Sequence, residues 1–156
     1  MRNKLNEIEE NLDSILVQAV EIGRDKLIEV IKNRVKKGRD QDNTSFSPYS
    51  YGHKRRRDKA GLQTQVKDLH YSDTMFENFV EVDRSVSSTR AEIKVSFRGQ
   101  ANRREDQRAA TNRQVAQWLT EQEGKPIVGV SRQEIAIISD AMRRGITDEI
   151  GKIEIT

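Results

Sequence analysis

Apolar residues follow the period of an α-helix along the first 37 residues. They recur every three or four positions, which places them on one face. The opposite face carries acids early and bases late, as the helix dipole favours, and Gly38 is suited to end the helix. Gly23 and Lys26 interrupt a strict seven-residue repeat. The pattern therefore predicts one long amphipathic helix over residues 3–37 that packs on a sheet of its own domain.

The period changes to two residues in the middle of the chain. Apolar and polar positions alternate twice, with a connection expected at residues 85–88, which predicts an antiparallel hairpin with one solvent-facing side. A short helical turn capped by Ser72, with Asp73 in its first turn, is expected just before the hairpin. The apolar side chains expected to point inward are Met75, Phe76, Phe79, Val80, Val82, Ala91, Ile93, Val95 and Phe97.

Two further helices are predicted after the hairpin. The first covers residues 103–123, has Trp118 in its apolar stripe as a core residue, and stops at Gly124. The second opens at a capping box over residues 131–134 and closes at Gly145. The tail from residue 150 to residue 156 alternates again, which predicts an edge strand.

These elements predict an α+β fold. The long N-terminal amphipathic helix and two further helices pack on a small antiparallel sheet, in a single domain of residues 1–156. Residues 39–71 have no period and contain many turn-forming residues, so we interpret them as a long, extended and irregular assembly arm. Such an arm is expected to be mobile in the isolated chain and to become ordered against neighbouring subunits.

Composition limits the kinds of function to be considered. Hydrophobic residues make up 34% of the chain and charged residues another 34%, so the core is expected to be small. The absence of cysteine excludes disulfides, thiolate metal sites and a cysteine nucleophile. The charged N-terminus and the lack of a long apolar run indicate a soluble chain without membrane contact. The net charge is only +3, so the clustering of basic residues matters more than their number.

No residue pattern of an enzyme is present. His53 and His70 lie near Asp58 and Asp68, and they are either a metal or acid–base pair or, as we favour, polar loop residues. The sequence contains no glycine-rich phosphate loop, nucleophile elbow or zinc spacing. We therefore expect no catalytic residue, no cofactor and no metal, and a protein that is not an enzyme.

The basic run Lys54–Lys59 is the charge cluster most relevant to function. It is either a solvated loop or a surface that contacts phosphates or an acidic partner, and two tyrosines stand close to it. The candidate partner-interface residues are Tyr49, Tyr51, Lys54, Arg55, Arg56, Arg57 and Lys59.

Three stretches resemble one protein family. They are Pro48-Tyr49-Ser50 through Lys59 and Gly61, then Asp68-Leu69 with Thr74-Met75, and finally Lys125–Ser131. In this order, they resemble elements of bacteriophage tail-completion and virion-morphogenesis proteins, which join heads to tails. Asp73 stands near the position of the family's usual glycine, and Ile127 or Val128 replaces its aromatic residue.

The resemblance implies a structural virion protein at the neck or tail terminus, made in the host cytoplasm. It implies a homo-oligomeric ring, with a hexamer favoured, that contacts adjoining neck or connector proteins and the tail tube. Non-specific contact with DNA in the channel is a further expectation. The alternative is a nucleic-acid-binding accessory protein that uses the run Lys54–Lys59.

Overall fold

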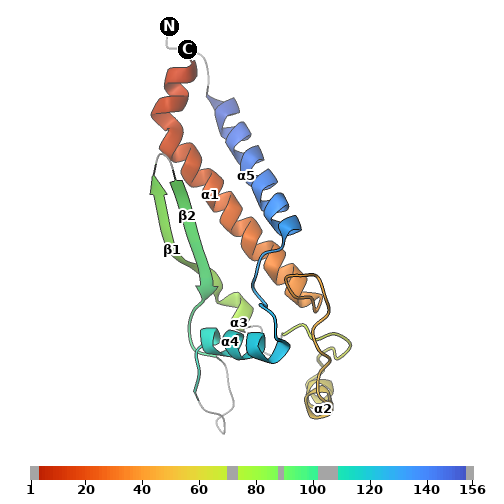
Figure 1. Cartoon of the computed structure of the whole chain (residues 1–156). Coiled ribbons are helices and arrows are strands. Elements are labelled where there is room, and N and C mark those ends of the chain that lie inside the picture. Colours follow the sequence, from red (N-terminus) through yellow and green to blue (C-terminus); the bar gives the residue numbers. More distant parts are fainter. Residues whose placement is uncertain (1–3, 70–73, 88–89, 102–108, 154–156) are drawn as a thin grey trace. The chain divides into compact units, whose positions relative to one another are not determined.

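The computed structural model describes residues 4–69, 74–87, 90–101 and 109–153, and it confirms the predicted α+β class (Figure 1). In the described residues, the elements are α1 Lys4–Lys36, α2 Tyr51–Lys59, α3 Thr74–Glu77, β1 Phe79–Ser87, β2 Arg90–Phe97, α4 Asn112–Glu123 and α5 Arg132–Lys152.

The chain divides into two compact units. Unit 1 contains residues 1–28, 81–95 and 132–156, and unit 2 contains residues 29–80 and 96–131. The single-domain prediction for residues 1–156 stays a prediction.

Helix α1 confirms the long helix predicted from the first apolar pattern. Its end at Gly38 has the left-handed conformation expected of a C-terminal glycine, with φ of 71°. The N–H of Gly38 donates to the carbonyl of Val35 at 2.8 Å, and the N–H of Arg39 donates to that of Arg34 at 3.2 Å. These two bonds satisfy carbonyls that the end of the helix would otherwise leave unpaired.

In unit 1, α5 runs antiparallel to the first part of α1, and two glycines allow the helices to approach closely (Figure 1). A Cβ atom added at Gly23 would lie 2.7 Å from Sδ of Met142, and one at Gly145 would lie 2.3 Å from Cδ1 of Ile22. The prediction that Gly145 ends the last helix is therefore wrong, because this glycine is an interior packing position and α5 continues to Lys152.

The expected edge strand is wrong for residues 150–152, which are helical. The rest of that prediction lies partly outside the described residues, in 154–156.

The hairpin of β1 and β2 confirms the predicted antiparallel pair, although β1 extends to Ser87 and so shortens the expected connection. Lys94 pairs with Asp83 across the strands at 3.0 Å. Arg84 reaches Glu21 of α1 at 2.9 Å and Glu81 of its own strand at 2.8 Å. Unit 1 therefore ties its hairpin to α1 through charged side chains.

In unit 2, the core gathers three phenylalanines from α3, β1 and β2. Phe76, Phe79 and Phe97 are buried, with ring centroids between 4.9 and 6.3 Å apart. Met75, which precedes Phe76 in the sequence, is also buried. This confirms that the side chains of this turn point inward, as predicted. The expected cap at Ser72 and Asp73 lies outside the described residues.

Helix α4 differs from its prediction at its start and in the position of its tryptophan. Residues 109–111 are not helical, and α4 opens at a capping box formed by Thr111 and Gln114. The end is confirmed, since Gly124 is left-handed with φ of 68°. Trp118 is 44% exposed, so its assignment to the core is wrong. The buried side of α4 carries Ala116, and two residues advance about 200° around a helix, which turns Trp118 outward.

Residues 39–69 are folded in unit 2, and the prediction of a wholly irregular arm is wrong for residues 51–59, which form α2. Arg39 and Ser45 form an antiparallel bridge, and Phe46 is buried. The mobility predicted for this segment in the isolated chain stays a prediction.

Candidate functional site

Helix α2 contains the whole basic run, and local capping explains both of its ends. The hydroxyl of Ser50 accepts a bond from the N–H of His53 at 3.4 Å, which caps the start. At the other end, the N–H of Gly61 donates to the carbonyl of Asp58 at 3.1 Å, and the N–H of Leu62 donates to that of Arg57 at 3.0 Å. This pattern requires a left-handed residue, and Gly61 has φ of 69°.

The side chain of one arginine of the run is buried on the inner side of α2. Arg57 is 1% exposed, and its Nη2 lies 3.1 Å from Oδ1 of Asp68. Its Nε donates to the carbonyl of Gln63 at 2.8 Å. The guanidinium also lies over the ring of Tyr49, 4.6 Å from the ring centroid, and the hydroxyl of Tyr49 donates to Asp68 at 2.8 Å. We call Tyr49, Arg57, Gln63 and Asp68 the anchor of α2.

The anchor corrects two of the predicted interface residues. Arg57 is an internal partner of Asp68, and half-buried Tyr49 is fixed by the same carboxylate, so neither presents its polar group as an open contact surface. A buried guanidinium needs a carboxylate and further acceptors, and the sequence alone did not show that Asp68 supplies them. The available signal was Asp68 itself, which stands in the second stretch of the family resemblance.

The surroundings of Tyr49 and of the neighbouring His53 favour the neutral forms of these two side chains. Burial and the adjacent Asp68 carboxylate raise the pKa of Tyr49. Burial and the charges of Arg56, Arg57 and Lys67 lower the pKa of His53, whose ring stacks on Tyr49 at 4.8 Å. His53 therefore contributes stacking at neutral pH, and His70 lies outside the described residues.

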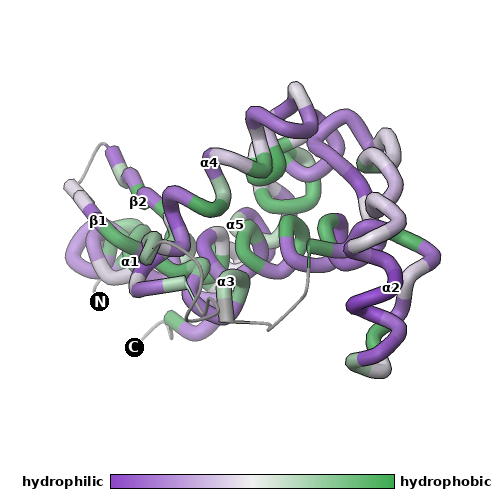
Figure 2. Tube along the Cα trace, turned by 90° about the horizontal axis from the view of Figure 1, so that it is seen from below, coloured by the Kyte–Doolittle hydropathy of each residue, from purple (hydrophilic) through white to green (hydrophobic). Residues whose placement is uncertain are grey.

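The other basic side chains of α2 face outward. Because each residue turns a helix by about 100°, His53 and Arg57 share the anchored side, while Tyr51, Arg55 and Lys59 form a stripe on the opposite side. Tyr51 is 82% exposed. Figure 2 shows α2 as a mainly hydrophilic helix. We define the basic ridge as the exposed residues Tyr51, Lys54, Arg55, Arg56 and Lys59.

The remainder of the segment is fixed to the end of α4. Lys67 and Glu123 form a buried ion pair, and the N–H of Ser47 donates to Glu123 at 2.8 Å. Burial opposes ionisation of Glu123, but the bonds from Lys67 and Ser47 outweigh it and lower the pKa of this carboxyl. The base of α2 is therefore held in unit 2 by paired charges.

Two further contacts extend this framework to the stretch Lys125–Ser131. Asp40 accepts from the N–H groups of Asp42 and Thr44, both at 2.9 Å, and lies 3.2 Å from Nζ of Lys125. The guanidinium of Arg34 donates to the carbonyl of Gly129 at 2.5 Å. Sequence reasoning did not identify Arg34 or Asp40, because their partners in the stretch Lys125–Ser131 lie more than 80 residues away.

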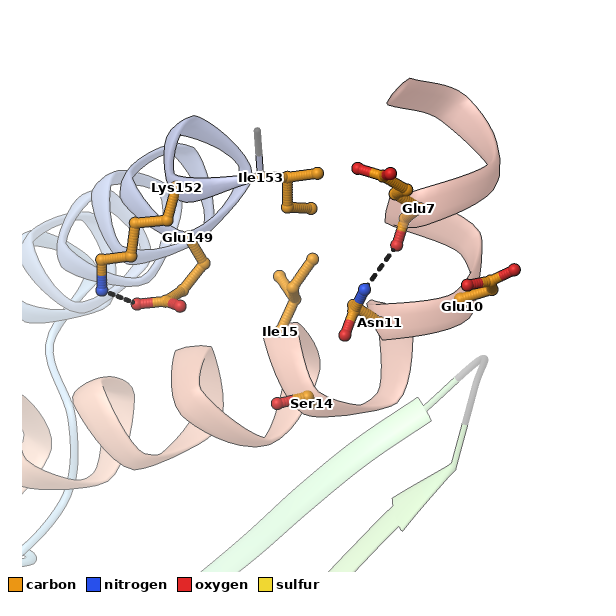
Figure 3. A pocket seen from close by; sticks show the side chains of 8 residues that line it. All are labelled: Glu7, Glu10, Asn11, Ser14, Ile15, Glu149, Lys152 and Ile153. Carbon is orange, nitrogen blue, oxygen red and sulfur yellow. Dashed lines mark hydrogen bonds and ion pairs between the residues drawn. The ribbon is translucent and has the colours of Figure 1, made fainter. Parts of the chain in front are cut away.

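A pocket of about 380 Å³ lies in unit 1, between the start of α1 and the end of α5 (Figure 3). Buried Ile15 lies in it, and Glu7, Glu10 and Glu149 give it an acidic lining. Glu149 is paired with Lys152. In the described ranges of the chain, no three histidine, cysteine or acidic residues are grouped to hold a metal.

The comparisons with known proteins return no match: no family model, no curated protein and no solved structure is similar to this chain. Among the helices that the structure describes, none combines the length and apolarity needed to cross a membrane.

Proposed function

We propose that this chain is a structural protein of a tailed bacteriophage virion, a neck or tail-completion component that assembles as a ring and connects tail to head. One observation supports the proposal most directly. The residues that carry the resemblance to this family include Tyr49, Gly61 and Asp68, and these same residues cap and anchor α2. The likeness therefore concerns a folded local unit, not a scatter of surface residues.

The third stretch of the resemblance supports the same interpretation. Ile127 is fully buried, and the carbonyl of Gly129 accepts from Arg34. Lys125 contacts Asp40 in the loop that precedes α2. Residues of all three stretches thus stabilise the folded structure of unit 2. This suits a protein that assembles with others and catalyses no reaction.

The basic ridge is the surface that we assign to contacts with other components of the particle. The anchor fixes the rotation of α2, so the ridge is presented in one orientation. A closed ring repeats each contact at every copy, so weak exposed charge pairs contribute together although each contributes only about 0–1 kcal/mol. The proposed partners are further copies of the chain, adjoining neck or connector proteins, the tail tube and the DNA that passes through the channel.

The test has a biochemical part and a cellular part. The purified chain should form rings at high concentration, visible by electron microscopy and by light scattering after size exclusion. In infected cells, the double variant Arg55→Glu/Lys59→Glu should leave heads and tails unjoined. Arg143→Glu/Arg144→Glu is the matched control, since it makes the same charge change on an exposed part of α5. Absence of the protein from purified particles would refute the proposal.

A nucleic-acid-binding accessory protein is the second candidate, and the basic ridge is the observation that favours it. The two candidates differ in what the ridge must recognise. Normal joining of heads and tails, together with loss of a tight and sequence-selective DNA complex in the Arg55→Glu/Lys59→Glu variant, would favour the accessory protein.

A further inference from the structure

Many cations on the surface of the described chain are compensated by a nearby carboxylate, whereas those of the basic ridge are not. Arg24, Arg84, Lys94 and Lys125 each lie within 4 Å of a carboxylate, and so do many other cations. In contrast, Lys54, Arg55, Arg56 and Lys59 make no ion pair with any residue that the structure describes.

The net charge of α2 follows from counting its cations, its acid and its ion pair. Arg57 is neutralised by Asp68, and the helix carries a single acid, Asp58. Four exposed cations and one carboxylate therefore leave +3 on a helix of nine residues. This equals the formal charge of the whole chain, so the remainder of the molecule is close to neutral. An excess of this kind favours a polyanion.

The lysines of the ridge favour a nucleic acid over an acidic protein as its partner. Lysine is depleted at the centres of protein interfaces, whereas arginine and aromatic residues are enriched there. The ridge has two lysines, two arginines and one exposed tyrosine. Lysine and arginine supply the phosphate contacts that dominate non-specific binding to DNA.

The spacing of the ridge fits contact along a backbone. Residues three or four apart on a helix have Cβ atoms about 5–6 Å apart, so Arg55 and Lys59 are neighbours and Tyr51 lies one turn before them. Lys54 and Arg56 flank this line on either side. The buried Arg57 holds the helix in this rotation, so the cations need little reorganisation to meet a row of phosphates.

We infer that the basic ridge binds the phosphate backbone of double-stranded DNA without reading its sequence. The choice of duplex DNA rests on the proposed function, because a head–tail connector surrounds the path of the genome. The contact with phosphates is inferred from the exposed cations of the ridge, which have no carboxylate partner in the described part of the chain. No groove-reading helix is required, since phosphate contacts position a protein on DNA and carry no sequence information.

The test measures binding of the full chain to a fluorescent duplex by anisotropy over a range of salt concentrations. Each phosphate contact contributes about 0.9 to the slope of log affinity against log salt concentration. With four contacts, affinity should fall roughly 100-fold between 50 and 200 mM salt. The Arg55→Ala/Lys59→Ala variant should lose about half of the slope, so that the same change in salt lowers its affinity only roughly 10-fold.

Control measurements distinguish DNA binding by the ridge from a general effect of positive charge. Arg143→Ala/Arg144→Ala removes two exposed positive charges from α5 and should leave the slope unchanged. Circular dichroism should show the same helix content in all variants. Two duplexes of different sequence should bind equally, and polyglutamate should compete much more weakly than DNA.

Four results would overturn the inference: no binding at 50 mM salt, an equal loss of slope in both double variants, strong preference for one sequence, or polyglutamate competing as well as DNA. The last result would instead indicate an acidic protein partner. Failure of ring formation with intact DNA binding would count against the proposed function alone. Normal rings without DNA binding would count against this inference alone.

Discussion

Removing the carboxylate of Asp68 should destabilise unit 2 more than most single substitutions. Asp68 is buried, and it pairs with Arg57 at 3.1 Å while accepting from Tyr49 at 2.8 Å. Asp68→Ala leaves a guanidinium buried without its counter-charge. Breaking a buried ion pair from one side typically costs about 3–5 kcal/mol, because the remaining charge stays desolvated.

The expected size of the effect can be measured by unfolding. At about 2–4 °C per kcal/mol for a domain of 150–250 residues, Asp68→Ala should lower Tm by roughly 10 °C. Urea unfolding followed by tryptophan fluorescence reports on unit 2, because the chain has one tryptophan, Trp118, and it lies there. Far-UV circular dichroism gives the helix content of the whole chain in the same experiment.

Two further variants test the reasoning. Arg57→Met combined with Asp68→Leu removes both charges, so it should be clearly more stable than Asp68→Ala alone. Arg55→Met is the matched control two residues away, and its exposed side chain should change stability by no more than about 0.5 kcal/mol. A cost below about 1 kcal/mol for Asp68→Ala, or a double variant as unstable as the sum of its single changes, would refute the anchor as an energetic unit.

Three other outcomes are expected. Gly61→Ala should cost about 1 kcal/mol in urea unfolding, because alanine is strained at φ of 69°. Gly145→Leu should cost about 1–3 kcal/mol in thermal unfolding, because it overfills the contact between α5 and α1. Hydrogen bonds from Arg84 and Arg24 lower the pKa of Glu81 to about 2, below its unfolded value, so its contribution is present above about pH 4.5 and is lost as the pH falls through 2. Glu81→Gln should therefore flatten the dependence of Tm on pH in this range.

Matched changes control these predictions. Gly52 lies inside α2 and Gly151 inside α5, and an added Cβ would meet no atom within 4 Å at either position. Gly52→Ala should stabilise the chain by roughly 0.5 kcal/mol through helix propensity, and Gly151→Leu should be near neutral. Equal effects at Gly61 and Gly52, or at Gly145 and Gly151, would contradict the structural reasons given. An unchanged pH dependence in Glu81→Gln would contradict the role of its arginine partners.

The sequence alone determined the elements whose stability comes from local pattern. The apolar period of residues 3–37 and the glycine after it specify α1 almost to its ends, and alternation specifies the hairpin. These signals suffice because a repeating apolar face and a left-handed cap act within a few residues of each other. The α+β class followed from the same patterns. Five of the seven predicted interface residues are also exposed in the structure, as their charge or position in a turn-rich stretch suggested.

Tertiary structure decided the features that depend on distant partners. Helix α2 has no apolar face, so periodicity gave no sign of it, and its rotation is set by Arg57 meeting Asp68 eleven residues later. Glycine often ends a helix, yet Gly145 lies inside α5, where Ile22 of α1 occupies the space that a side chain would need. Trp118 is turned outward because Ala116 lies on the buried side of α4. In each case a contact across the fold outweighed the local preference, and no pattern within one segment records such a contact.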